Sequence, residues 1–320
     1  VRLANPKGIL DLGDGENRNQ SGNRMITFSV TPKYEFNRHL SLQEHFNFTL
    51  VNTNENYYLP LEGTPPFRLM ASSNIQVTNM AQSLAARQNA IMSDTRLSWS
   101  NRYGAHKIDV FGGIRYSSSN YKLTAQRGFD TGNDKYPSTG NARNYRSTWG
   151  ADDKTRDLNW YAQGDYNWGE KYYVEAGISA ETSSRFGKDA DGLKLGGVVW
   201  GLFPSVNAAW VISNEKWLAD VKGIDYLRLN IGFDVTGNDD LDYTASKTYF
   251  VANNMLTQKV DGKSIGNIGN TSLAWETTSR LTAGVETNIL NNRINLRFNY
   301  FKGWTKNLLT LRQLAWTSGL

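Results

Sequence analysis

The sequence predicts an all-β fold of antiparallel strands, and three observations support the prediction. Apolar and polar residues alternate with a period of two in ten separate stretches, the pattern of strands with one apolar and one polar face. The 320 residues include 16 Tyr, 10 Trp and 29 Gly but only 7 Pro, which favours strands and turns over helices. The connections between the stretches alternate between short and long.

The clearest stretch is the segment 158–186, which we interpret as a hairpin with a tight turn. The first arm places these residues on one face: Leu158, Trp160, Ala162, Gly164, Tyr166 and Trp168. Aromatic rings near the ends of such a row, with small residues between them, are expected on the lipid-facing side of a transmembrane β-barrel. A β-sandwich hairpin with its apolar face in a dry core would give the same pattern, so this hairpin alone leaves both alternatives open.

An earlier hairpin is expected over residues 24–50, with a short turn at 37–39, and it is the least regular. Glu44 interrupts its apolar row, and Pro32 cannot donate a hydrogen bond to a neighbouring strand. The remaining arms are expected at 97–99, 108–116, 206–212, 227–236, 281–289 and 294–300.

The lengths of the connections favour the barrel over the sandwich. Short connections are expected at 37–39, 101–107, 168–171, 213–224 and 291–293. Long loops are expected at about 1–23, 52–94, 118–155, 187–201 and 237–275. Bacterial outer-membrane barrels have short periplasmic turns and long extracellular loops, whereas a sandwich has no reason to keep its long loops at one end. The sequence therefore predicts about ten strands of a transmembrane β-barrel.

Two short helical segments are expected inside the connections. Residues 79–92 have helical spacing and composition, and 213–223 begins with a Ser/Asn cap before a short helical turn.

Composition excludes several classes of function. The net charge of +5 is not concentrated in a basic tract, which argues against nucleic-acid binding. No run approaches the roughly 18 apolar residues of a membrane-spanning helix. The absence of Cys excludes disulfides, thiol catalysis and thiolate metal sites within this sequence.

No metal or cofactor site is expected. The three histidines, His39, His45 and His106, lie in or beside short turns without metal-ligand spacing. The loops "DADG" at 189–192 and "GNDDLDY" at 237–243 offer oxygen ligands for Ca²⁺ but lack the spacing of a calcium-binding loop. Solvated turn residues are the favoured explanation for these Asp and Asn side chains.

The charged residues of the polar strand faces are interpreted as a lumen wall. They are Asp165, Glu175, Glu181, Arg228 and Arg297. Paired carboxylates could also hydrolyse glycosides, but nothing else in the sequence supports a hydrolase, and barrels place polar side chains inward. We therefore expect no enzymatic activity.

The aromatic residues of the long loops are the candidate contacts for a ligand or for a lid protein. They are Tyr57, Tyr58, Phe67, Phe129, Tyr136, Tyr145, Trp149, Trp200 and Tyr249. Such rings can stack on sugars or hold peptide side chains, and they can equally pack the loops on one another.

Five phrases in the right order give a specific resemblance across 158–309, while residues 1–157 share only the hairpin rhythm. They are "ETSSRFG" (181–187), "GLFPSVNAAWVISNEKWL" (201–218), "LRLNIGFDVTGNDDL" (227–241), "NTSLAWETTSRLTAGVET" (270–287) and "LNNRINLRFNYFKGWTKNLL" (290–309). In these phrases the sequence resembles the SusC/RagA-type TonB-dependent outer-membrane transporters of Bacteroidota.

The resemblance implies a barrel of about 22 strands in the bacterial outer membrane. It also implies an N-terminal plug with a TonB box, energised by the TonB-ExbB-ExbD complex, and a SusD-like surface lipoprotein as a lid. Plug and TonB box are not found in this sequence, which lacks an initiating Met and a signal segment, so a fragment of a longer chain is expected.

The expected function is import of oligosaccharides or oligopeptides through the outer membrane. Two alternatives remain open: a siderophore or vitamin receptor of the same wider group, and a non-transport surface protein such as an adhesin or a carbohydrate-binding module.

Overall fold

The computed structural model describes residues 7, 19–61, 63–69, 74–136, 138–141, 144–218, 221, 223–255 and 258–310. Within these ranges the side chains of 141, 144, 252–255 and 258–264 are not described. Most of the loop expected at 1–23 and parts of 52–94, 118–155, 213–224 and 237–275 therefore lie outside the described residues.

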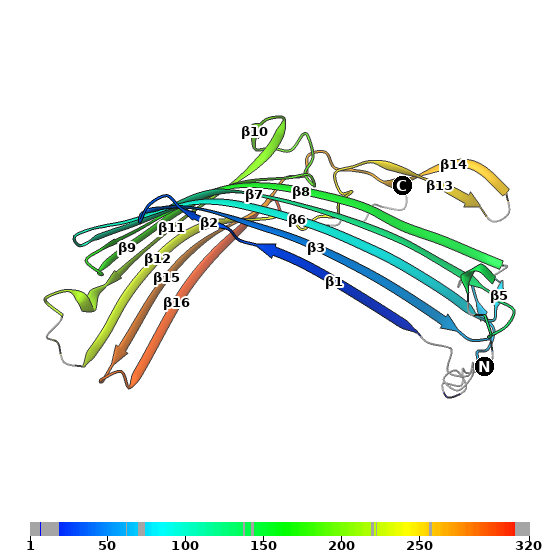
Figure 1. Cartoon of the computed structure of the whole chain (residues 1–320), viewed down its shortest axis with the longest axis horizontal. Helices are drawn as coiled ribbons and strands as arrows, with labels where there is room; N and C mark the ends of the chain where they lie inside the picture. The colour runs from blue at the N-terminus through cyan, green and yellow to red at the C-terminus, as the bar shows by residue number, and fades with distance from the viewer. Residues whose placement is uncertain are drawn as a thin grey trace. The chain divides into compact units, whose positions relative to one another are not determined.

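The described residues form one large antiparallel sheet, and Figure 1 shows its long strands in sequence order. The long strands are β1 (Gln20–Val30), β3 (Leu40–Leu59), β6 (Met80–Tyr103), β7 (His106–Phe129), β8 (Asn144–Trp168), β9 (Tyr172–Ser183), β11 (Val198–Val211), β12 (Ile224–Asn238), β15 (Glu276–Ile289) and β16 (Ile294–Lys306). The short strand β2 (Lys33–Glu35) pairs with β3, and β10 (Leu193–Leu195) pairs with β11. The predicted all-β fold with ten long strands is confirmed.

The sheet is open among the described residues, because β1 and β16 stand at the two ends of its strand order. Two small hairpins lie outside it: β4 (Phe67–Arg68) with β5 (Gln76–Val77), and β13 (Tyr249–Met255) with β14 (Gln258–Asn267). No helix among the described residues is long and apolar enough to cross a membrane.

The chain divides into two compact units. Unit 1 comprises residues 1–29, 47–91 and 118–154, and unit 2 comprises 30–46, 92–117 and 155–320. Unit 1 thus holds the long-loop ends of β3, β6, β7 and β8, and unit 2 holds their short-turn ends and all later strands.

The helix expected at 79–92 is wrong, because residues 80–92 belong to β6, which has 24 residues. Good helix formers such as Ala, Leu, Gln and Met dominate the segment, and both faces of the strand carry polar side chains, so the period of two is hidden. Pairing with β3 and β7 supplies the backbone hydrogen bonds that override this local propensity.

Other loop boundaries also change. β7 and β8 reach Phe129 and Asn144, which shortens the loop expected at 118–155. The expected helical turn after residue 213 is a single 3-10 turn, η2 (Ile212–Asn214), continued by a turn in which Leu218 N donates to Glu215 O at 3.0 Å. A second 3-10 turn, η1 (Thr139–Asn141), lies between β7 and β8.

The first expected arm is interrupted where the sequence suggested it. β1 ends at Val30 and β2 begins at Lys33, so Thr31 and Pro32 separate the two strands. The Pro32 carbonyl still accepts a hydrogen bond from Glu44 N at 3.0 Å, but Pro32 has no N–H to continue the ladder.

The hairpin β8–β9 has the predicted tight turn. Trp168 pairs with Tyr172, and Gly169 and Glu170 both have positive φ angles of 60° and 58°. Two consecutive left-handed residues form the type I′ turn that suits the twist of a hairpin.

The two faces of the sheet in unit 2 differ in polarity. Large apolar side chains on one face are exposed, as Trp160 (53%), Ile231 (57%) and Phe298 (69%) show. An apolar surface of this extent requires an apolar environment outside the sheet. We call this side the outward face and the opposite side the polar face.

Candidate functional site

The polar face of unit 2 is the candidate site, because strand register places its charged side chains in rows. Arg228 on β12 pairs with Glu286 on β15, which in turn pairs with Arg297 on β16. Asp165 on β8 pairs in the same way with Glu175 on β9. The register therefore brings together side chains that are far apart in the sequence.

These rows line a hollow of about 680 Å³. Four of the five predicted wall residues, Asp165, Glu175, Arg228 and Arg297, contribute to its lining. The fifth, Glu181, lies farther along β9, where its carboxylate accepts from Asn159 Nδ2 at 2.8 Å and from Ser179 Oγ at 3.0 Å. The polar face is therefore a charged concave surface.

The charges around the hollow are only partly compensated. Arg297 Nη2 donates to Glu286 Oε1 at 2.7 Å, but the buried Nε of Arg228 has no hydrogen-bond partner within the described residues. Asp165 accepts from Gln163 at 3.0 Å, and Glu175 accepts from Asn207 at 3.4 Å. Buried polar atoms normally have partners, so a polar group from outside these residues fits this surface.

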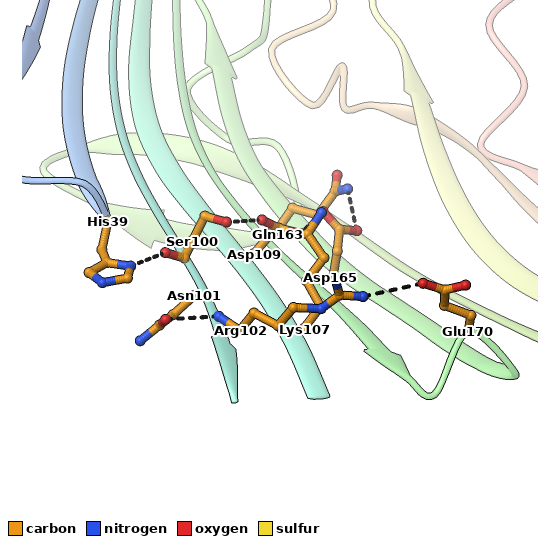
Figure 2. A network of polar contacts seen from close by, with 9 residues as sticks. All are labelled: His39, Ser100, Asn101, Arg102, Lys107, Asp109, Gln163, Asp165 and Glu170. Carbon is orange, nitrogen blue, oxygen red and sulfur yellow. Dashed lines mark hydrogen bonds and ion pairs between the residues drawn. The ribbon is translucent and has the colours of Figure 1, made fainter. Parts of the chain in front are cut away.

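The short-turn end of the polar face is held by the network in Figure 2. His39 Nδ1 donates to the Ser100 carbonyl at 2.9 Å, and Ser100 Oγ donates to Asp109. The second oxygen of Asp109 lies 2.9 Å from Lys107 Nζ. These contacts join the turn before β3 to β6 and β7, and Lys107 and Asp109 also line the hollow.

The histidine side chains form hydrogen bonds within the sheet. His45 Nδ1 lies 2.7 Å from Thr31 Oγ1, and His106 Nδ1 lies 2.7 Å from the Tyr166 hydroxyl. The described residues contain no group of three or more His, Cys, Asp or Glu arranged to hold a metal ion.

A second hollow of about 400 Å³ lies farther along the polar face, where β3, β6, β7 and β8 meet. Asp94 Oδ2 accepts from Arg115 Nη2 at 2.7 Å, and Asp94 Oδ1 accepts from the Tyr161 hydroxyl at 2.6 Å. The Arg96 guanidinium lies 3.7 Å from the centre of the Phe111 ring. Sequence reasoning missed Asp94 and Arg96, although Met92, Asp94 and Arg96 already alternate with Ser93 and Thr95.

An outward aromatic belt, formed by His106, Trp168, Tyr172 and Trp210, lies near the short turns. Successive rings are 5.8, 5.4 and 6.2 Å apart. The turn after β11 places Glu215 beside the belt, where its carboxylate accepts from Tyr172 Oη at 2.6 Å and Trp210 Nε1 at 3.2 Å. Lys171 Nζ also donates to Glu215 at 2.8 Å, and these hydrogen bonds, led by that of Lys171, lower the pKa of Glu215 to about 2.

In unit 1, Tyr58 is buried at the centre of a polar cluster. Its hydroxyl donates to Asp134 Oδ1 at 2.7 Å and accepts from Asn79 Nδ2 at 3.1 Å. Asn79 Nδ2 also donates to Thr131 Oγ1 at 2.7 Å, and Asn79 is fully buried. The cluster fastens the connection after β3 to the connection after β7.

The remaining aromatic candidates differ in exposure. Phe129 packs edge to face on Phe67 with ring centroids 6.2 Å apart, and Phe129 is buried. Trp200 is buried in unit 2, with its Nε1 donating to Leu195 O at 3.1 Å. The exposed candidates are Tyr57, Tyr136, Tyr145, Trp149 and Tyr249.

An aromatic cluster at the long-loop end of unit 2 joins four of the five quoted phrases. Trp275 packs on Phe186 and Phe203, with ring centroids 4.5 and 5.2 Å away. A Cβ on Gly201 or Gly237 would lie 2.6 or 2.3 Å from Phe203 Cζ, so the rings need glycine at both positions. The sequence alone did not predict that these four segments contact one another.

Comparisons with known proteins give the family. The family described as "TonB dependent receptor-like, beta-barrel" matches residues 3–319. The TonB-dependent receptor P3 of Formosa agariphila is 23% identical over 291 residues, covering 90% of this chain and 28% of the relative. The TonB-dependent receptor SusC of Bacteroides thetaiotaomicron is 29% identical over 143 residues, covering 43% of this chain and 14% of the relative.

The fold also has a solved counterpart in the RagAB peptide transporter. That structure matches with a TM-score of 0.76 and 18% identity over 94% of this chain and 32% of its own chain. The chain thus spans less than a third of the length of each of these proteins.

Three observations indicate the wall of a β-barrel: the family match, the two-faced antiparallel sheet and the register of its polar face. Such a sheet needs a membrane on its apolar side and a polar interior on the other, as the wall of a barrel provides. The chain belongs to the TonB-dependent receptor-like β-barrel family of the outer membrane.

Proposed function

We propose that the chain forms part of the wall of a TonB-dependent importer that takes up oligosaccharides or oligopeptides through the outer membrane. The observation that carries the proposal is the polar face, where a hollow of about 680 Å³ is lined by charged side chains from successive strands. Similarity to SusC and to the RagAB peptide transporter supports import of a polymeric nutrient. The match to a receptor family, together with this polar wall, supports transport rather than catalysis.

In this proposal Asp165, Glu175, Glu181, Arg228 and Arg297 form the lumen wall. They hold water and fixed charge along the inner surface, which keeps an acyl chain out of the lumen and gives polar cargo a compatible surface. The outward face meets the acyl chains of outer-membrane lipid.

The connections at 60–79, 130–143, 184–197 and 239–275 are proposed to be extracellular. Five exposed rings, Tyr57, Tyr136, Tyr145, Trp149 and Tyr249, are the proposed contacts for cargo or for a SusD-like surface lipoprotein. Tyr58, Phe129 and Trp200 would act indirectly, because their buried rings shape the loops that carry the exposed ones.

Uptake by the full-length protein in its native outer membrane tests the function. Deletion of the gene is expected to abolish uptake of one fluorescently labelled class, oligosaccharide or oligopeptide, and deletion of tonB is expected to have the same effect. A deletion strain that still imports both classes but fails to grow on a ferric siderophore would favour the siderophore alternative.

A matched pair of variants tests the lumen wall. The double variant Asp165→Asn/Glu175→Gln changes the charge of the polar face, and Val206→Leu changes the outward face by one methylene group. The first is expected to alter the rate of uptake at unchanged protein level, and the second to leave it unchanged. Equal rates in both would contradict the assigned wall.

The lid is tested by purification of the full-length protein from outer membranes in mild detergent. A lipoprotein encoded beside its gene is expected to copurify in a fixed ratio. If the protein purifies alone and still imports its cargo, the SusD-like partner is wrong while the importer stands.

A further inference from the structure

The outward face of unit 2 carries an acidic side chain within an apolar row, at Glu44 of β3. Gln43 and His45, its neighbours in sequence, line the polar hollow of about 400 Å³, so Glu44 points to the opposite side of the sheet. On that side it lies between Leu42 and Phe46. An ionisable group on a membrane-facing surface is costly, and it marks an interaction that repays the cost.

Hydroxyl groups alone hold the Glu44 carboxylate in the described structure. Ser93 Oγ donates to Oε1 at 2.7 Å, and Thr95 Oγ1 donates to Oε2. Among the described residues no Lys, Arg or His forms an ion pair with Glu44. The negative charge is thus oriented by two neutral donors and lacks a counter-charge.

Small residues continue from this point across the outward face. The backbone carbonyl of Thr95 on β6 lies beside Gly113 of β7, which faces the polar side against Tyr161, and the neighbouring Gly112 faces outward beside Ala162 of β8. A Cβ on Gly112 would lie 3.7 Å from the Cβ of Ala162, and Gly164 follows on the same face. Small residues at a membrane-embedded surface let another backbone approach closely.

We propose that Glu44, Ser93 and Thr95 form a docking notch for a second membrane-spanning polypeptide, which presents a Lys or Arg side chain to Glu44. Charge complementarity selects this occupant, because a cation is what the carboxylate lacks. Acyl chains offer neither charge nor donor. A symmetric contact with a second copy would place the two Glu44 carboxylates in the same isologous interface, where they repel each other.

The inference rests on the membrane environment of the outward face and not on the imported cargo. The notch lies on the opposite side of the sheet from the proposed lumen wall. Loss of the docked partner is therefore separable from loss of uptake, and each can fail without the other.

Photocross-linking in living cells tests the notch in the full-length protein. p-Benzoylphenylalanine replaces Phe46, the outward neighbour of Glu44 on β3, and in a control it replaces Ile178, an exposed outward residue of β9. Irradiation at position 46 is expected to give a protein adduct that mass spectrometry identifies as one membrane-spanning polypeptide, joined near a Lys or Arg. Position 178 is expected to give no adduct with that polypeptide.

The dependence of the adduct yield on the Glu44 carboxylate distinguishes docking from mere proximity. Glu44→Gln is expected to lower the adduct yield about tenfold, since a buried ionic partner is lost, while Glu44→Asp retains much of it. Heat-dependent mobility on gels checks that each variant is folded. Charge reversal by Glu44→Lys, combined with the opposite change at the partner's identified cation, is expected to restore the adduct.

Three outcomes overturn the proposal: adducts with phospholipid only, adducts with a second copy of the same protein, or an unchanged yield in folded Glu44→Gln.

Discussion

The ring of Phe203 meets the ring of Trp275 edge to face, with centroids 5.2 Å apart and an interplanar angle of 77°. Phe203 lies on β11, and Trp275 directly precedes β15, with β12 between these strands in the sheet. Close by, Arg185 Nη1 donates to Asp239 Oδ2 at 2.7 Å. Both contacts fasten the ends of long connections to the wall.

Glycine at position 237 is expected to be required for this cluster. In Gly237→Ala the new Cβ would lie 2.3 Å from Phe203 Cζ and 2.9 Å from Trp275 Cε3, and both rings are buried. Overpacking of this kind costs about 1–3 kcal/mol. Guanidinium unfolding of the full-length protein measures the loss. Gly303→Ala is the control, because its Cβ would have no neighbour closer than 3.8 Å, and equal losses in both would contradict the steric argument.

Glu215 is expected to stabilise the folded protein in a manner that depends on pH. Its pKa falls from the ordinary 4.5 to about 2, so the folded state favours the carboxylate. The stabilisation is complete well above pH 4.5 and is lost as the pH falls toward 2. Glu215→Gln should therefore lower the unfolding midpoint at pH 7 but hardly at pH 2.

Unfolding midpoints across this pH range measure the difference. The control is Glu170→Gln, which removes a more exposed ion pair with Arg102 and should have a small effect. A constant difference between Glu215→Gln and the unchanged protein down to pH 2 would show that the charge is not responsible.

Asn79 is expected to hold the cluster of unit 1 together. Its side chain is fully buried and bonds to Tyr58, to Thr131 Oγ1 and, through Oδ1, to Thr131 N at 2.9 Å. Asn79→Ala removes the printed partner of Thr131 N and one hydrogen bond each from Tyr58 Oη and Thr131 Oγ1, which should cost about 1–3 kcal/mol. Proteolysis of intact cells should then cut near residues 60–69 or 130–136 more rapidly. Asn89→Ala, which removes one exposed bond with Arg87 on the same strand, should leave cleavage unchanged.

Exposed rings at the long-loop ends are expected to matter for cargo. Tyr57→Ala and Tyr249→Ala remove exposed rings from the proposed vestibule and should raise the KM of uptake about two- to tenfold each, with little change in folding. Tyr116→Ala is the matched control, because this exposed tyrosine lies on the outward face of β7. A control that impairs uptake as strongly as the other two would argue against direct contact.

The proposed orientation in the membrane can be read by single cysteines, since the sequence contains none. Lys188→Cys lies in the connection between β9 and β11, and Lys216→Cys lies in the turn between β11 and β12. On intact cells a membrane-impermeant maleimide should label the first and not the second. The reverse pattern would place the long connections in the periplasm.

Several features could be predicted from the sequence because they are local. A strand whose faces meet different surroundings shows it by alternation, so the ten strands and the short turn at 168–171 were recognisable. Pro32 likewise marked the break between β1 and β2, because the missing N–H is a property of the residue itself.

The wrong predictions fall where this local signal is absent. Where β6 carries polar side chains on both faces, alternation vanishes and helical propensity misleads over residues 79–92. The charged residues of the polar face were predictable as a set, yet the pairing of Arg228 with Glu286 and Arg297 needed the strand register.

The sequence by itself determined most of the strands, their two faces and the family phrases, since each depends on residues that are close together in the chain. Only the tertiary structure decided that Tyr58 is buried against Asp134, that Phe186 and Phe203 meet at Trp275, and that Ser93 and Thr95 donate to Glu44. These contacts join residues from different strands and loops, and they exist only once strand order and register are fixed.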